Sequence, residues 1–189
     1  MPDDPPSQPG EAAAKPFPPL ALLAALTQAL RRETLSTGEA AALRRLDPAG
    51  PDRRHILPLA RLMVEAGIED LPPAGQRHAR LALIANAVAL ARGAHDPQRP
   101  TGAALHALRL SEQRLMALLA ADLANLTDLL PRIARRAAAA GEAMDWRPLV
   151  LLAWFADHDE ARADEQRRRI AGAWLRAAAS AARPQPNAA

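Results

Sequence analysis

The sequence predicts an all-α fold, and three observations support this prediction. Leucine, isoleucine and valine recur at helical spacing in several segments. No run of alternating valine, isoleucine and threonine predicts a strand. Aromatic residues, which strands favour, make up only 3% of the 189 residues. We therefore expect an irregular two-lobed helical bundle of about eight or nine helices, without an internal repeat of fixed period.

Proline density sets the expected limits of the folded body. Residues 1–19 are acidic and rich in proline and lack the features of a secretory signal, so we expect a disordered head there. Residues 20–95 are expected to form an N-terminal helical lobe and residues 101–180 a C-terminal helical lobe. A loop with two prolines separates them. Residues 181–189 are expected to form a flexible tail.

Four helices are expected in the N-terminal lobe. Ser36 and Glu39 form a capping-box pattern at the start of the second helix. Pro58 either starts or kinks the third, and Gly93 stops the fourth. The expected helices cover residues 20–30, about 36–46, 51–66 and 75–92.

Five helices are expected in the C-terminal lobe. Ser111, Asp145 and Asp159 stand where N-caps are expected, and Pro131 either kinks or restarts the helix that carries a leucine stripe. The expected helices cover residues 101–110, a short segment after Ser111, and residues 123–140, 146–154 and 159–180. Trp146 and Trp154 lie close to one helix face, so core packing is a better interpretation of both than stacking on bases.

The sequence offers no catalytic centre. It has no cysteine, which excludes thiolate chemistry, and its five histidines never fall in a paired metal-ligand spacing. An acidic cluster of Asp157, Asp159 and Glu160 surrounds His158, but its place at a helix junction favours capping. We therefore expect no enzyme activity, no metal and no cofactor. Charge interrupts every apolar run, which predicts a soluble protein without a membrane partner. The absence of cysteine fits a reducing environment, so we expect a cytoplasmic protein.

The isoelectric point near 10.7 exaggerates the basicity of the chain. The formal net charge is only +3, and with no tyrosine, no cysteine and one lysine almost nothing titrates between histidine and arginine. The distribution of the arginines is therefore more informative than their number.

Several arginines form clusters on predicted helix surfaces. Arg132, Arg135 and Arg136 point away from the leucine stripe of their helix, and Asp128 could pair with the first of them. The planar guanidinium group binds phosphate oxygens through two donors, although an ordinary solvated surface also explains such clusters. Similar outward pairs are expected at Arg44 with Arg45, Arg77 with Arg80, and Arg168 with Arg169.

Six short motifs follow one another between about residues 35 and 175. They are Leu43-Arg44-Arg45, Arg77-His78, Thr101-Gly102-Ala103-Ala104-Leu105, Ser111-Glu112-Gln113-Arg114-Leu115, the basic segment 132–136, and Asp145-Trp146. Their order and spacing resemble the CasB family, the small subunit of the type I-E CRISPR surveillance complex Cascade.

The resemblance implies a non-catalytic subunit of an antiviral defence complex. Its implied partners are the other Cascade protein subunits, further copies of itself, the crRNA, the target DNA and the displaced non-target strand. Basic residues would stabilise the R-loop, because the exchange of one duplex for another is nearly balanced. The residues expected to bind nucleic acid are Arg44, Arg45, Arg77, Arg114, Arg132, Arg135, Arg136, Arg168 and Arg169.

Two other functions stay open on the sequence alone. A helical sequence-specific DNA-binding regulator would need a recognition helix, for which residues 76–78 and 111–114 are the candidates. A metal-dependent helical enzyme would be built on Asp157 and Asp159.

Overall fold

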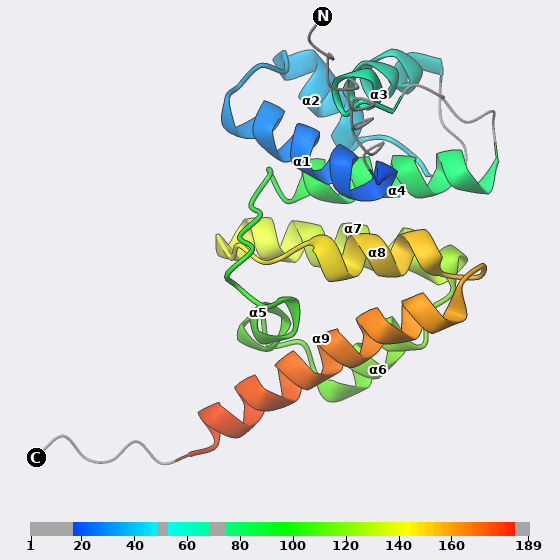
Figure 1. Ribbon diagram of the computed structural model, residues 1–189. Coiled ribbons are helices and arrows are strands. Elements are labelled where there is room, and N and C mark those ends of the chain that lie inside the picture. Colours follow the sequence, from blue (N-terminus) through cyan, green and yellow to red (C-terminus); the bar gives the residue numbers. More distant parts are fainter. Residues whose placement is uncertain (1–16, 49–52, 69–74, 184–189) are drawn as a thin grey trace, which may run out of the picture.

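The computed structural model describes residues 17–48, 53–68 and 75–183, and these residues form nine α-helices and no strand (Figure 1). The all-α prediction is therefore confirmed for this part of the chain. The expected disordered head lies almost wholly outside the described residues, as does most of the tail. The helices are α1 (Pro18–Arg31), α2 (Thr37–Arg44), α3 (Arg53–Glu65), α4 (Gln76–Leu90), α5 (Thr101–Ala107), α6 (Glu112–Leu119), α7 (Leu123–Ala140), α8 (Arg147–Phe155) and α9 (Glu160–Ala181).

Local hydrogen bonds start several helices where the sequence predicts them. The Ser36 hydroxyl and the Glu39 carboxylate cap α2 reciprocally, which confirms the capping box. The Ser111 hydroxyl accepts a hydrogen bond from the third residue of α6, and Asp159 does the same for α9. Each cap satisfies a backbone N–H that has no partner within its helix.

Several expected helix boundaries differ from the structure. α5 ends at Ala107, three residues before the expected end. α1 begins at Pro18, two residues early, because proline is well suited to a first helical turn. Pro131 lies inside α7 and does not restart it. α8 begins at Arg147 after Trp146 as its N-cap, so the prediction that Asp145 is the N-cap is wrong. The Asp145 carboxylate still accepts a hydrogen bond from the N–H of Arg147, at 3.1 Å.

The helices lie in three layers in Figure 1, with α1 to α4 at the top, α7 and α8 in the middle, and α5, α6 and α9 below. α4 packs against both α7 and α8, and α8 packs against α9. One cluster of buried apolar side chains runs through all three layers. The N-terminal helices are therefore joined to the C-terminal ones by a shared core, and the division into two lobes stays a prediction.

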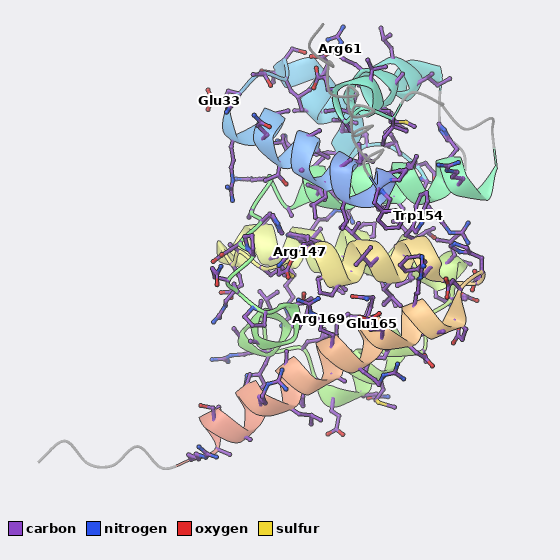
Figure 2. All side chains as sticks on the ribbon, viewed as in Figure 1. Glu33, Arg61, Arg147, Trp154, Glu165 and Arg169 are labelled. Atoms are coloured by element: carbon purple, nitrogen blue, oxygen red, sulfur yellow. The ribbon has the colours of Figure 1, made fainter. Side chains whose placement is uncertain are left out.

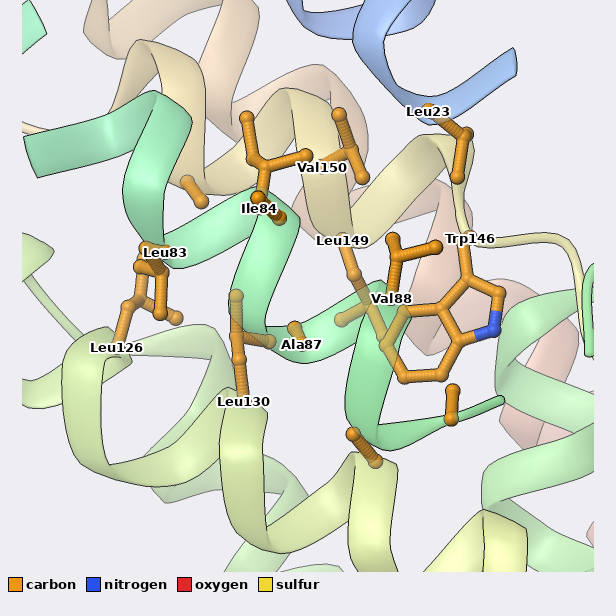
Figure 3. Packing of buried hydrophobic residues seen from close by; sticks show 14 of the residues in the cluster. Leu23, Leu83, Ile84, Ala87, Val88, Leu126, Leu130, Trp146, Leu149 and Val150 are labelled. Carbon is orange, nitrogen blue, oxygen red and sulfur yellow. The ribbon is translucent and has the colours of Figure 1, made fainter. Parts of the chain in front are cut away.

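The centre of this core lies where α4 meets α7 and α8 (Figure 3). Leu83 and Val88 of α4 lie among Leu126 of α7 and Leu149 of α8. Trp146 is 1% exposed and Trp154 is also buried, so core packing is confirmed for both tryptophans.

The loop after α4 is bound to the segment before α8. The Trp146 indole N–H donates to the Ala94 carbonyl at 3.0 Å, and the Trp146 backbone N–H donates to Nδ1 of His95 at 3.2 Å. The Asp145 N–H donates to the Arg99 carbonyl at 2.8 Å. This segment therefore holds the N-terminal and C-terminal helices in a fixed relation.

α5 and α9 approach each other closely at Gly102. A Cβ atom at this position would clash with the carbonyl oxygen of Ile170 and the amide nitrogen of Trp174 on α9. Only glycine fits there without a shift of one helix. In the part of the chain that the structure describes, no helix is long and apolar enough to cross a membrane.

Candidate nucleic-acid interface

The nine arginines that the sequence predicts to bind nucleic acid are all exposed. Exposure alone is ordinary for arginine, so their arrangement decides which of them could act together. Six of the nine lie on two adjoining hollows, and three do not.

The first hollow lies between the end of α2 and the middle of α7, and its volume is about 440 Å³. Arg44 and Arg45 line it from α2, and Arg132 and Arg135 line it from α7. These two pairs are far apart in the sequence. We call this site the α2–α7 hollow.

Asn86 of α4 positions the arginine end of α2. Its side chain is 3% exposed, and its amide nitrogen donates to the carbonyl oxygens of Leu43 at 3.0 Å and Arg44 at 3.1 Å. The last carbonyls of a helix lack partners within that helix, and here a buried amide satisfies two of them. Asn86 was not predicted from the sequence, where its only signal is a polar residue within an apolar run.

Arg44 and Arg45 keep most of their hydrogen-bonding capacity for a ligand. Nε of Arg44 donates to the Ala89 carbonyl at 3.3 Å, and Nε of Arg45 donates to the Ala41 carbonyl at 3.2 Å. Among the described residues, neither guanidinium group forms an ion pair within 4.0 Å. The bonds through Nε orient both groups and leave the terminal nitrogens available.

The second hollow lies between α6 and α7 and measures about 400 Å³. Arg114 lines it from α6, and Arg132 and Arg136 line it from α7, over an apolar wall that includes Leu118. Arg136 also donates to the Arg109 carbonyl at 3.5 Å. We call this site the α6–α7 hollow.

Arg132 lines both hollows, because positions 132, 135 and 136 share one helix face while Arg135 turns toward α2 and Arg136 toward α6. The hollows therefore join into one surface that carries six arginines, with Asp47 and Asp128 also in the lining of the α2–α7 hollow. The suggested pair of Arg132 with Asp128 is not formed within 4.0 Å, although Asp128 lines the α2–α7 hollow. We call the following six residues the arginine track: Arg44, Arg45, Arg114, Arg132, Arg135 and Arg136.

The other three expected arginines lie away from the track. The guanidinium carbon of Arg77 is 5.8 Å from the centre of the Trp154 ring, a cation–π distance. Arg168 and Arg169 lie on α9, and Figure 2 shows Arg169 in the lower layer. Arg169 lines a separate hollow of about 240 Å³.

The prediction that Arg80 forms an outward pair with Arg77 is wrong. Arg80 is 5% exposed and donates to the Ala156 carbonyl at the end of α8, at 2.7 Å. Burial lowers the pKa of its guanidinium group, and the charge of Asp157 acts in the opposite sense. The reason is that α4 packs against α1 and α2 on one side and against α7 and α8 on the other, so a wider face is buried than the apolar stripe alone indicates.

The acidic cluster near His158 has structural partners. The Asp157 carboxylate accepts from the N–H of Leu123 at 3.1 Å, at the start of α7. Asp159 caps α9, and Glu160 pairs with Arg167 at 2.5 Å. Within the described ranges, no group of three histidine, aspartate or glutamate side chains could hold a metal ion.

Fold and site together define an all-α protein whose exposed arginines gather on two adjoining hollows. The family model described as CRISPR-associated protein Cse2 matches residues 39–177, well over half of the chain, and the chain therefore belongs to this family. The family, also called CasB, is the small subunit of the type I-E CRISPR complex Cascade. The matched region includes every residue of the arginine track. No curated protein and no solved structure matches the chain.

Proposed function

We propose that this chain is a non-catalytic Cascade subunit that supports crRNA-guided DNA binding, and that its arginine track holds the phosphate backbone of the displaced strand. One observation carries the proposal: Arg132 joins two hollows, so that six exposed guanidinium groups lie on one surface. The proposed partners are the other Cascade subunits, further copies of this chain, the crRNA and the target DNA. The process served is antiviral defence.

The chemistry of the track suits a phosphate backbone and not a particular base sequence. A guanidinium group offers two parallel donors to phosphate oxygens and stays charged at any cellular pH. Each phosphate that it neutralises releases condensed counterions, which favours binding without reading the bases. Formation of an R-loop exchanges one duplex for another at nearly equal free energy. A modest contribution from the track would therefore shift the balance toward the open state.

The net charge of +3 limits what the isolated chain would do. A small excess of positive charge gives weak binding that salt screens readily. Within an assembly, several copies and subunits would bind the same strand and raise its effective concentration. We therefore expect weak binding by the free chain and a clear effect in the complex.

The test is R-loop dissociation from complete complexes at physiological salt. One complex contains the wild-type chain, and the other contains Arg44→Ala, Arg45→Ala, Arg114→Ala and Arg132→Ala together. Four contacts of the strength of exposed ion pairs, at about 0.5 kcal/mol each, amount to about 2 kcal/mol, so dissociation should accelerate roughly thirtyfold.

The matched control replaces four exposed arginines that line neither track hollow, namely Arg92, Arg109, Arg162 and Arg183. This control loses the same charge and should dissociate much more slowly than the track variant. Equal dissociation of the track variant and the wild type would refute the role of the track. A sharp preference of the free chain for one duplex sequence would instead indicate a DNA-binding regulator.

A further inference from the structure

A third hollow, of about 420 Å³, lies between α1 and the start of α8. Arg31 and Arg32 line it from the end of α1, Arg147 lines it from α8, and His95 lines it from the connecting loop. Figure 2 shows Arg147 and Trp154 at opposite ends of α8. We call this site the α1–α8 hollow. It shares no lining residue with the arginine track, and α1 precedes the region that the family model matches.

Two positive charges of this hollow have no carboxylate partner among the described residues. Arg147 is neutralised by the buried Asp145, since its Nε and Nη2 donate to the two carboxylate oxygens at 2.8 and 2.9 Å. Arg31 donates to the His95 carbonyl, and the Arg32 guanidinium faces the Gln28 side-chain amide. These bonds orient both groups without cancelling either charge.

Thr27 provides an independent indication of a ligand. Its side chain lines the hollow and is only 6% exposed, and its hydroxyl has no hydrogen-bond partner among the described residues. A buried hydroxyl without a partner is unfavourable. The hydroxyl oxygen is buried as the structure stands, so a rotation of the Thr27 side chain would bring it to an acceptor in the hollow and remove that cost.

The start of α8 also favours an anion. The His95 ring is fixed beside it, because Nδ1 accepts from the Trp146 N–H and the ring is also hydrogen-bonded to the Met144 backbone. Arg147 is the first residue of α8, and the N-terminus of a helix carries partial positive charge. Leu20, Leu23 and Ala24 supply an apolar wall beside these donors.

From this arrangement we infer that the α1–α8 hollow binds a phosphate group. The two uncompensated guanidinium charges match a phosphate dianion, and the threonine hydroxyl adds a neutral donor. The phosphate comes either from a free phosphate monoester or inorganic phosphate, or from the backbone of a strand. The site is independent of the proposed function of the track.

The test is a titration of the full chain, labelled with ¹⁵N, by inorganic phosphate at constant ionic strength. Binding should shift the backbone amide signals of Trp146 and Arg147 in a saturable way. The double variant Arg31→Ala with Arg32→Ala should lose at least about tenfold in affinity. The matched control is Arg109→Ala with Arg183→Ala, which also removes two exposed arginines but lines neither this hollow nor the track, and it should bind phosphate like the wild type.

A second variant keeps the test informative if the double variant folds poorly. Thr27→Val preserves the shape of the side chain and removes the hydroxyl, so affinity should fall roughly threefold to tenfold. Signals that shift linearly without saturation, or that shift equally in the wild type and both hollow variants, would overturn the inference.

A decathymidylate without terminal phosphates separates the two sources. If it shifts the same amides in the wild type and the track variant, the site takes a strand phosphate; if only inorganic phosphate shifts them, the site takes a free phosphate. Either result supports a phosphate site. Loss of the track alone would leave these shifts in place, which distinguishes failure of the proposed function from failure of this inference.

Discussion

Replacing Gly102 by alanine tests how closely α5 approaches α9. The added methyl group would meet backbone atoms of Ile170 and Trp174, which cannot rotate away as a side chain can. Overpacking of this kind costs about 3 kcal/mol at the upper end of its usual range. Alanine recovers about 1 kcal/mol through its higher helix propensity. We therefore expect a net loss of roughly 2 kcal/mol, or about 4–8 °C in Tm for a chain of this size.

Thermal unfolding followed by circular dichroism measures this loss. The matched control is Gly172→Ala on α9, where the new atom would meet only the mobile end of the Arg176 side chain, at 3.4 Å. That variant should be at least as stable as the wild type, because it gains propensity without a clash. A Tm for Gly102→Ala equal to or above that of the wild type would refute the close packing of these two helices.

Three further predictions concern the two functional surfaces. Asn86→Leu leaves the last carbonyls of α2 without their partner, so the free energy of unfolding should fall by about 1–3 kcal/mol in urea titrations. Arg132→Ala should reduce the salt dependence of single-strand binding by about 0.7 in the slope of log K against log salt, since one phosphate contact is lost. Burial lowers the pKa of His95 below its usual 6.5, with the charge of Asp145 opposing. The unfolded state therefore binds the proton more readily, so stability should fall as the pH drops below about 6.5, and His95→Asn should flatten this dependence in Tm measurements.

Each of these predictions has an outcome that contradicts it. Unchanged stability of Asn86→Leu would mean that water satisfies the α2 carbonyls equally well. An unchanged salt slope for Arg132→Ala would remove that residue from the phosphate contacts. Identical pH profiles for the wild type and His95→Asn would show that another group causes the dependence.

Features that depend on neighbours within one turn were predictable from the sequence. Ser36, Ser111 and Asp159 each cap a helix by a bond to the third residue beyond, so their pattern is visible along the chain. Helix positions follow from apolar spacing for the same reason. The start of α8 was less predictable, because bonds from Trp146 to the loop after α4 hold that residue outside the helix.

The burial of a side chain at the edge of a helix's apolar stripe was not predictable from the sequence. Arg80 and Arg77 are close in sequence and in charge, yet one is buried against the end of α8 and the other is exposed. The difference depends on packing against α8, which the sequence around these two arginines does not specify. The role of Asn86 was not predictable for the same reason, because its hydrogen-bond partners are carbonyls of α2, far away in the sequence.

By itself, the sequence determined the all-α class, most helix ranges, the core role of Trp146 and the exposure of all nine expected arginines. These properties depend on hydrophobic spacing and short-range hydrogen bonds, which the order of residues encodes directly. Only the tertiary structure decided which arginines lie on one surface. The track exists because α4 holds the end of α2 beside α7, and packing between distant segments brings their charges together.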